Sequence, residues 1–319
     1  MGEAFTAAQA VEAGASYSQL SESVARQRYD RPWRGIYLSR GSSWKERLVA
    51  AGTASDGVVS HRTAGRLHGL WGLESHDGIE LTVPPDRRFS RRGMVVHQSP
   101  LDEADLTTVD GISGVTTLAR TIIDLAAVLH GDAYAIAFES AWCLAPGLLE
   151  EIERRLEQIG SVGRHGMKRL RALMADARRR ERPLESPLEV RFWRRLQAWG
   201  MPLPLTGVEV DDGGGNRYRL DFFYPEQKLA IETDGFTWHG SRDRWAADCR
   251  KQTRAAAAGY RLMRVTPEDL DERTGDHLLW RRLLSALGVR ALRPKLRRGA
   301  QLLWPGPPSR HLSGPPTPR

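Results

Sequence analysis

Residues 219–233 constrain the fold of this chain more than any other segment, because they predict a β-hairpin. Two short extended runs meet at a turn around Glu226 and Gln227. Folding the hairpin about that turn places Asp221 opposite Glu232, and directly opposed side chains have Cβ atoms about 5 Å apart. At that separation two carboxylates repel one another unless a cation lies between them.

Strand alternation divides the side chains of this hairpin between two faces, because successive residues of a strand point to opposite sides. The acidic face is expected to carry Asp221, Ala230, Glu232 and Asp234, and the apolar face Leu220, Phe222, Leu229 and Ile231. Carboxylate oxygens suit Mg²⁺ or Mn²⁺. The acidic face is therefore a candidate divalent-cation site, and the alternative is a pair of strand residues facing solvent.

The elements around the hairpin predict an α/β domain with a mixed sheet. Ser186 is expected to cap a helix, Pro187 to occupy its first turn and Glu189 to close a capping box. Further elements are expected at 208–210 (strand), about 242–258 (helix), 260–265 (strand) and from Pro267 (helix). His239, five residues after Asp234, is a candidate general base.

The residues Glu232-Thr233-Asp234-Gly235-Phe236-Thr237-Trp238-His239, with Asp221, Asp248 and 259–265, resemble the Vsr-like branch of the PD-(D/E)XK restriction-endonuclease-like superfamily. The resemblance covers about residues 183–285 and implies a Mg²⁺- or Mn²⁺-dependent DNA endonuclease. It implies Asp221 and Glu232 as metal ligands, the Thr233 carbonyl as a further ligand, His239 beside the scissile phosphate and Glu189 as an accessory carboxylate.

Asp234 departs from the pattern of that superfamily. It stands where most members carry lysine and where very-short-patch repair enzymes carry histidine. Either His239 or Lys251 supplies the missing cation, or the nuclease has lost activity. Lys251, in the predicted basic helix, is also expected to contact DNA.

The first 45 residues predict a winged helix-turn-helix. Thr6 is expected to cap one short helix, and Ser16 or Ser18 to begin a second. Residues 29–38 then predict a ribbon of two short strands, which completes the order typical of this DNA-binding module. Three arginines near the end of the second helix and in the ribbon are expected to bind nucleic acid: Arg26, Arg28 and Arg34.

Residues 1–180 resemble AbiEi-type antitoxins and regulators. The resemblance rests on the ribbon ending Gly35-Ile36-Tyr37-Leu38 and on the segments 61–70 and 114–126. It implies binding to operator DNA, with a cognate toxin or another product of the same operon as a further partner. Strands are also expected at 79–83 and 94–97, and an amphipathic helix at 117–129.

The histidines of this region carry no metal-ligand spacing. His61, His68 and His97 have no acidic partner at the short sequence intervals that metal motifs use. Isolated histidines are more often part of a core or a surface than of a site. We therefore interpret these three as structural residues.

Charge is distributed unevenly along the chain. Residues 1–150 contain 14 basic and 18 acidic side chains, 151–182 contain 10 and 5, and 286–319 contain 7 and none. Such clustering suits a polyanion such as DNA, although it also occurs on solvated surfaces. Without an apolar run of about eighteen residues or the regions of a signal peptide, a cytoplasmic protein with no membrane partner is expected.

These observations predict an α/β (α+β) chain in four parts. A winged helix-turn-helix (1–45) precedes an AbiEi-like α/β extension with a basic helical joint (46–182), a Vsr-like endonuclease domain (183–285) and a disordered basic tail (286–319). The function expected is a metal-dependent DNA endonuclease fused to a DNA-binding regulator. The alternatives are a non-enzymatic regulator or type IV antitoxin-like protein with a degenerate nuclease fold, and an RNA-directed nuclease.

Overall fold

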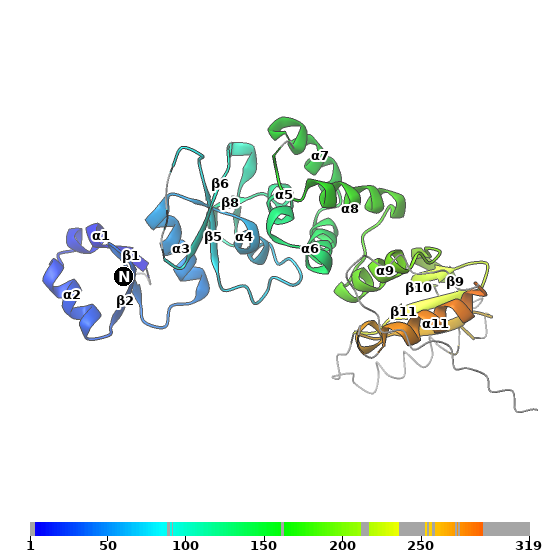
Figure 1. Ribbon diagram of the computed structural model, residues 1–319. Helices are drawn as coiled ribbons and strands as arrows, with labels where there is room; N and C mark the ends of the chain where they lie inside the picture. The colour runs from blue at the N-terminus through cyan, green and yellow to red at the C-terminus, as the bar shows by residue number, and fades with distance from the viewer. Residues whose placement is uncertain are drawn as a thin grey trace, which may run out of the picture.

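The computed structural model describes residues 4–87, 90, 92–160, 163–211, 217–235, 253, 255–256, 259–271, 273 and 275–289. Helices and mixed sheets build an α/β fold, as the sequence predicts. In this part of the chain, three sheets follow one another in chain order (Figure 1). Within these residues, every helix is too short or too polar to cross a membrane.

The first sheet has three antiparallel strands in the order β1-β3-β2. The elements are β1 (Ala4–Thr6), α1 (Ala7–Glu12), α2 (Tyr17–Ala25), β2 (Tyr29–Trp33) and β3 (Ile36–Ser39). Thr6 caps α1 and Ser16 caps α2, each through a hydroxyl that accepts a hydrogen bond from the backbone N–H three residues later. The predicted helix caps and the predicted ribbon are confirmed, with Ser16 rather than Ser18 as the second cap.

The second sheet has five strands in the order β6-β5-β4-β8-β7 and is mixed. Its region contains α3 (Trp44–Ser55), β4 (Val58–Val59), α4 (His61–Leu67), β5 (Ile79–Val83), β6 (Met94–Gln98), η1 (Glu103–Asp105), β7 (Leu106–Val109) and β8 (Ile112–Thr116). The predicted strands at 79–83 and 94–97 are confirmed. All five residues of β5 are buried, including the polar Glu80 and Thr82.

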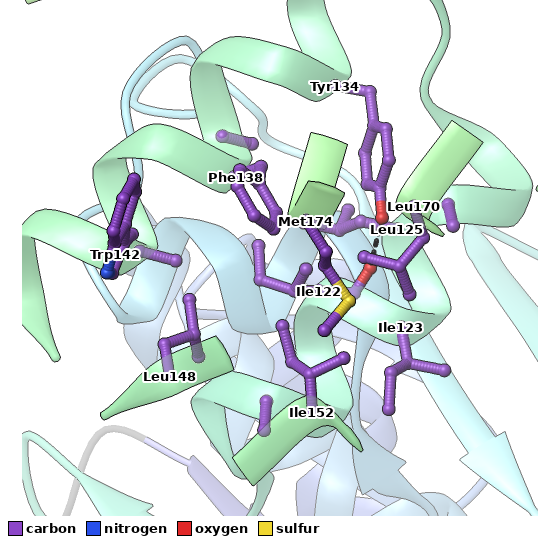
Figure 2. Packing of buried hydrophobic residues seen from close by; sticks show 14 of the residues in the cluster. Ile122, Ile123, Leu125, Tyr134, Phe138, Trp142, Leu148, Ile152, Leu170 and Met174 are labelled. Carbon is purple, nitrogen blue, oxygen red and sulfur yellow. Dashed lines mark hydrogen bonds between the residues drawn. The ribbon is translucent and has the colours of Figure 1, made fainter. Parts of the chain in front are cut away.

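Four helices follow the second sheet: α5 (Leu118–Val128), α6 (Gly131–Leu144), α7 (Leu148–Ile159) and α8 (Met167–Arg180). Figure 2 shows their shared core, in which Ile122, Phe138 and Ile152 are fully buried. The Tyr134 hydroxyl donates a hydrogen bond to the Ile122 carbonyl at 3.1 Å. Gly166 is required before α8, because a Cβ there would lie 1.9 Å from the Ala126 carbonyl oxygen.

A buried ion network joins these helices to the last region of the chain. The basic run 178–180 ends α8, and the Arg180 side chain is only 3% exposed. Arg180 pairs with Glu139 of α6 and with Asp176 of α8. The Trp193 indole N–H, from the next helix, donates to Asp176 Oδ2 at 2.7 Å. Arg180 therefore acts as a structural contact between α6 and α8 rather than as a solvated charge.

The third sheet has the order β12-β11-β10-β9, with β11 and β12 parallel and the other pairs antiparallel. Its region contains α9 (Pro187–Trp199), β9 (Leu205–Asp211), β10 (Arg217–Tyr224), β11 (Leu229–Thr233), β12 (Arg261–Val265), η2 (Glu268–Leu270) and α11 (Asp276–Leu287). Helices α9 and α11 pack on one face through Phe192 and Leu283, which contact the cluster around Phe222 and Ile231.

The C-terminal part of this region differs from the predicted helix. The helix predicted from Pro267 is a short 3₁₀ turn, and α11 begins only at Asp276. Asp271 is extended and its carboxylate accepts a hydrogen bond from the Arg273 N–H at 2.7 Å, a local bond that competes with the helix. Most of the helix predicted at 242–258, and the tail beyond residue 289, lie outside the described residues.

Candidate active site

Glu189 lies in the first turn of α9. Ser186 caps the helix and Pro187 follows it, as predicted, and Ser186 Oγ accepts a hydrogen bond from the Glu189 N–H at 3.1 Å. The predicted capping box is wrong in its second hydrogen bond, the one from the Ser186 N–H to the Glu189 carboxylate. The Glu189 carboxylate reaches one residue further back and accepts a hydrogen bond from the Glu185 N–H at 2.9 Å. This contact holds a largely buried carboxylate at the start of the helix.

Asp221 lies where β10 separates from β11. The ladder between the two strands ends at the pair Phe222 and Ile231, one pair before the expected Asp221–Glu232 pair. Asp221 Oδ2 instead accepts hydrogen bonds from the Thr233 N–H at 2.9 Å and from its hydroxyl at 3.0 Å. The Asp221 carboxylate accepts the Thr233 N–H in place of a backbone carbonyl of β10. The hairpin therefore has the predicted register but opens at Asp221.

The predicted alternation of faces is also wrong at this point. Phe222 packs with α9 and α11, as expected of the apolar face. Leu220 packs instead with Ala230 on the other side of the sheet. On β9, Gly207 has a φ of +55° and lies between the residues that pair with Leu220 and Phe222. The irregular backbone around Asp221 breaks the period of two.

Glu232 lies beside an arginine that the sequence analysis did not single out. Glu232 is 9% exposed, and the parallel register aligns it with Arg264 of β12. Paired residues of neighbouring strands point to the same face. Arg264 also forms an ion pair with Asp234, at 3.3 Å. A guanidinium therefore accompanies the acids at this end of the sheet, and the sequence signal for it was only a basic residue in the predicted strand 260–265.

The ionisation of Glu189 depends on its surroundings. Burial raises the pKa of Glu189 to about 7, and the hydrogen bond from Glu185 opposes that effect. The negative charge of Asp221 raises this pKa further. A carboxyl group with a pKa near 7 exchanges protons at neutral pH, as a general acid or base must. The carboxylates of α9 and β10 are therefore electrostatically coupled.

The other candidate residues are divided between described and undescribed parts of the chain. His239 and Lys251 lie outside the described residues. The first sheet and its two helices, residues 4–39, are called the first module. Arg26, Arg28 and Arg34 are all exposed on this module. Arg26 follows α2 directly and forms an ion pair with Glu22 of that helix, at 2.6 Å.

The interpretation of the histidines needs a correction. His61, Glu80 and His97 lie together, with one ligand atom of each within 4.8 Å of the others. The described residues contain no second such group of three, and the carboxylates of Glu189, Asp221 and Glu232 are spaced more widely. Sequence spacing missed the group because its members come from a helix and two paired strands. His68 does stay outside it, since its ring bonds the Thr116 carbonyl.

The chain is similar to two uncharacterized proteins of Mycobacterium tuberculosis, one from each of two strains. It is 26% identical to each over 261 residues, which cover 81% of this chain and 92% of the relative. A match of that length extends well beyond the third sheet. No protein-family model matches the chain.

Proposed function

We propose that this protein is a metal-dependent DNA endonuclease, with its active site at the end of the third sheet. The observation that carries the proposal is the position of Glu189. Its buried carboxyl has a pKa raised to about 7 by burial and by the charge of Asp221, which lies on a different element. A structural role does not require two acids to be held where each disfavours ionisation of the other.

The donor set fits Mg²⁺ or Mn²⁺, because it consists of carboxylate oxygens. Asp221 and Glu232 would hold the cation, and Thr233 is their close neighbour. When bound, such a cation neutralises phosphate charge and lowers the pKa of a coordinated water. The two hydrogen bonds from Thr233 orient the Asp221 carboxylate, so Thr233 acts as a positioning residue.

Glu189 is the residue to which we assign the proton transfer. As the oxygen of water bonds to phosphorus, Glu189 accepts the proton that water loses. The bond from phosphorus to the leaving ester oxygen breaks, and that oxygen keeps the electron pair and takes a proton from solvent. Arg264 supplies a positive charge beside Glu232. In this proposal Arg264 takes the role that lysine has in the superfamily.

DNA is the proposed substrate because of the first module. Its two capped helices and ribbon present Arg26, Arg28 and Arg34 to solvent, where they can contact phosphates. The proposal places the enzyme in the cytoplasm, where DNA and Mg²⁺ meet. A cognate toxin or operon product remains part of it as a partner of the first 180 residues.

A second candidate is a DNA-binding regulator that does not cleave. It is favoured by Asp234, which adds a negative charge where the superfamily places a cation and which engages Arg264 in an ion pair. In this second candidate the third sheet only supports binding.

Cleavage of supercoiled plasmid by the full-length protein in Mg²⁺ or Mn²⁺ separates the two candidates. Asp221→Asn is expected to lower the cleavage rate about a thousandfold, because several kcal/mol of charge stabilisation depend on the cation. Glu209→Gln is the matched control, since Glu209 is an exposed acid on the neighbouring strand β9. Binding of DNA is expected to be the same in all three proteins.

The outcomes discriminate clearly. If folded wild-type protein cleaves no nucleic acid and its melting temperature does not change with Mg²⁺ or Mn²⁺, the regulator replaces the nuclease. Preferential cleavage of single-stranded RNA in the same assay would change the substrate from DNA to RNA.

A further inference from the structure

A second group of metal-ligating side chains lies in the five-stranded sheet, far along the chain from the carboxylates. His61 begins α4, Glu80 lies on β5 and His97 on β6. The parallel register of β5 and β6 pairs Thr82 with His97, which brings His97 diagonally next to Glu80. One ligand atom of each of the three lies within 4.8 Å of the others.

Neighbouring polar groups hold each member of this group. Oγ of Ser60 lies 2.9 Å from His61 Nδ1 and accepts a hydrogen bond from the Thr82 hydroxyl at 2.8 Å. With Nδ1 engaged by Ser60, His61 has Nε2 to offer as a ligand atom. Ligating histidines in proteins are oriented in this way by a bond to the other ring nitrogen.

The Glu80 carboxylate contacts three side chains. Arg62 donates a hydrogen bond to its Oε1 at 2.8 Å, and His76 Nε2 lies 3.4 Å from the same oxygen. His97 Nε2 lies 3.0 Å from Oε2. Glu80 is 1% exposed, and a buried carboxylate without a charged or hydrogen-bonding partner is strongly disfavoured. One oxygen thus faces Arg62 and His76, and the other faces His97.

Backbone geometry and burial single out His61. Its φ of +51° lies in the left-handed region, which non-glycine residues rarely adopt and which clusters at functional sites. His61 is also buried, with 6% of the residue exposed. The rings of His61 and His97 stack with centroids 3.5 Å apart and 15° between their planes. Because imidazole binds a metal in the plane of its ring, Zn²⁺ binding would turn one of the two rings out of this stack.

We propose that His61, Glu80 and His97 form a Zn²⁺ site. Two imidazole nitrogens and one carboxylate oxygen suit Zn²⁺ and not Mg²⁺, which requires an octahedral set of oxygens. His97 is the most exposed of the three, with 23% of its side chain accessible.

The two nearby guanidinium groups both have carboxylate partners. Arg62 is paired with Glu80 Oε1. Arg120, the other guanidinium that affects His61, is bound by Asp105 and Asp124 at 2.8 and 3.0 Å.

Calorimetric titration of the chelator-treated, full-length protein with Zn²⁺ alone tests this site. One Zn²⁺ per chain and a higher melting temperature are expected of the wild type. His97→Gln is expected to weaken binding more than about a hundredfold, since even loss of an outer partner costs about 10- to 100-fold. His130→Gln, at an exposed histidine outside the group, is expected to bind as the wild type does.

Two further variants test whether Zn²⁺ binds at this group and not at the carboxylates of the third sheet. Thr82→Val keeps the shape of the side chain but removes the hydroxyl that holds Ser60, and is expected to weaken Zn²⁺ binding by about tenfold or more. Asp221→Asn is expected to leave Zn²⁺ binding unchanged, which makes this site independent of the proposed nuclease. The proposal is overturned if folded wild-type protein takes up no Zn²⁺, or if His97→Gln and Thr82→Val both bind it as tightly as the wild type.

Discussion

Asp105 in the middle of the chain and Glu189 at the third sheet are both buried carboxylates, but their partners have opposite charges. Asp105 is fully buried and receives Arg155 at 2.6 Å and Arg120 at 2.8 Å. Glu189 receives one backbone N–H, and Asp221 and Glu185 add negative charge nearby.

This difference separates structural from chemical use of the same side chain. A carboxylate that is desolvated among guanidinium groups remains charged and links the elements that carry those groups. A carboxylate that is desolvated beside other acids takes up a proton or a cation instead. We therefore interpret the acids around Arg120 as part of the scaffold and those around Asp221 as part of a site.

The largest effect is expected from breaking the scaffold. Arg120→Met removes the ion-pair partner of the buried Asp124 and one of the two arginines that bind Asp105, which keeps Arg155. Breaking a buried ion pair from one side costs about 3–5 kcal/mol of unfolding free energy. Urea denaturation of the variant and the wild type measures this loss.

A surface pair provides the control for that experiment. Arg87 and Asp56 form an ion pair whose side chains are 40% and 82% exposed. Arg87→Met is expected to leave the stability nearly unchanged. If Arg120→Met changed the unfolding free energy as little as Arg87→Met does, the structural role of the acids around Arg120 would be contradicted.

A smaller effect, with a distinctive pH dependence, is expected at Glu189. Its pKa is raised in the folded protein to about 7 from the ordinary 4.5, so folding favours the protonated form. The stability that this form provides is complete below about pH 4.5 and is lost as the pH rises through about 7. The loss is on the order of 3 kcal/mol, from about 1.4 kcal/mol per pKa unit.

Glu189→Gln removes this titration. Melting temperatures in chelator between about pH 4.5 and 8 should therefore fall more steeply with pH for the wild type than for Glu189→Gln. Saturating Mg²⁺ should reduce the difference, because a bound cation favours the charged carboxylate. Glu209→Gln serves as the reference in this experiment. Parallel curves of melting temperature against pH for the wild type and Glu189→Gln would contradict a raised pKa of Glu189.

The smallest effect on stability is expected from the exposed arginines of the first module. Replacing Arg26, Arg28 and Arg34 together by glutamine should not change the melting temperature, because these side chains are exposed. It should instead reduce the slope of log affinity for duplex DNA against log salt concentration. Each lost phosphate contact contributes about 0.9, so a decrease of about 2–3 is expected.

The control replaces Arg154 and Arg281, which are exposed on α7 and α11, by glutamine. An unchanged slope in the triple variant, or an equal decrease in the control, would remove the first module from the DNA interface.

Local features of this fold could be predicted well. Thr6, Ser16 and Ser186 cap the helices that they were expected to cap, and the hairpin at 219–233 has the expected register. The local errors arose where a side chain replaced a backbone partner. Asp221 takes the hydrogen bond of Thr233 and opens the hairpin, which periodicity alone does not reveal.

The sequence by itself determined the caps, turns and strand register, because these depend on residues a few positions apart, whose interactions form within one element. Only the tertiary structure decided that His61, Glu80 and His97 lie together, and that Arg264 lies beside Glu232. Those contacts depend on the strand orders β6-β5-β4 and β12-β11. Strand order follows from how whole elements pack, and no spacing along the chain specifies it.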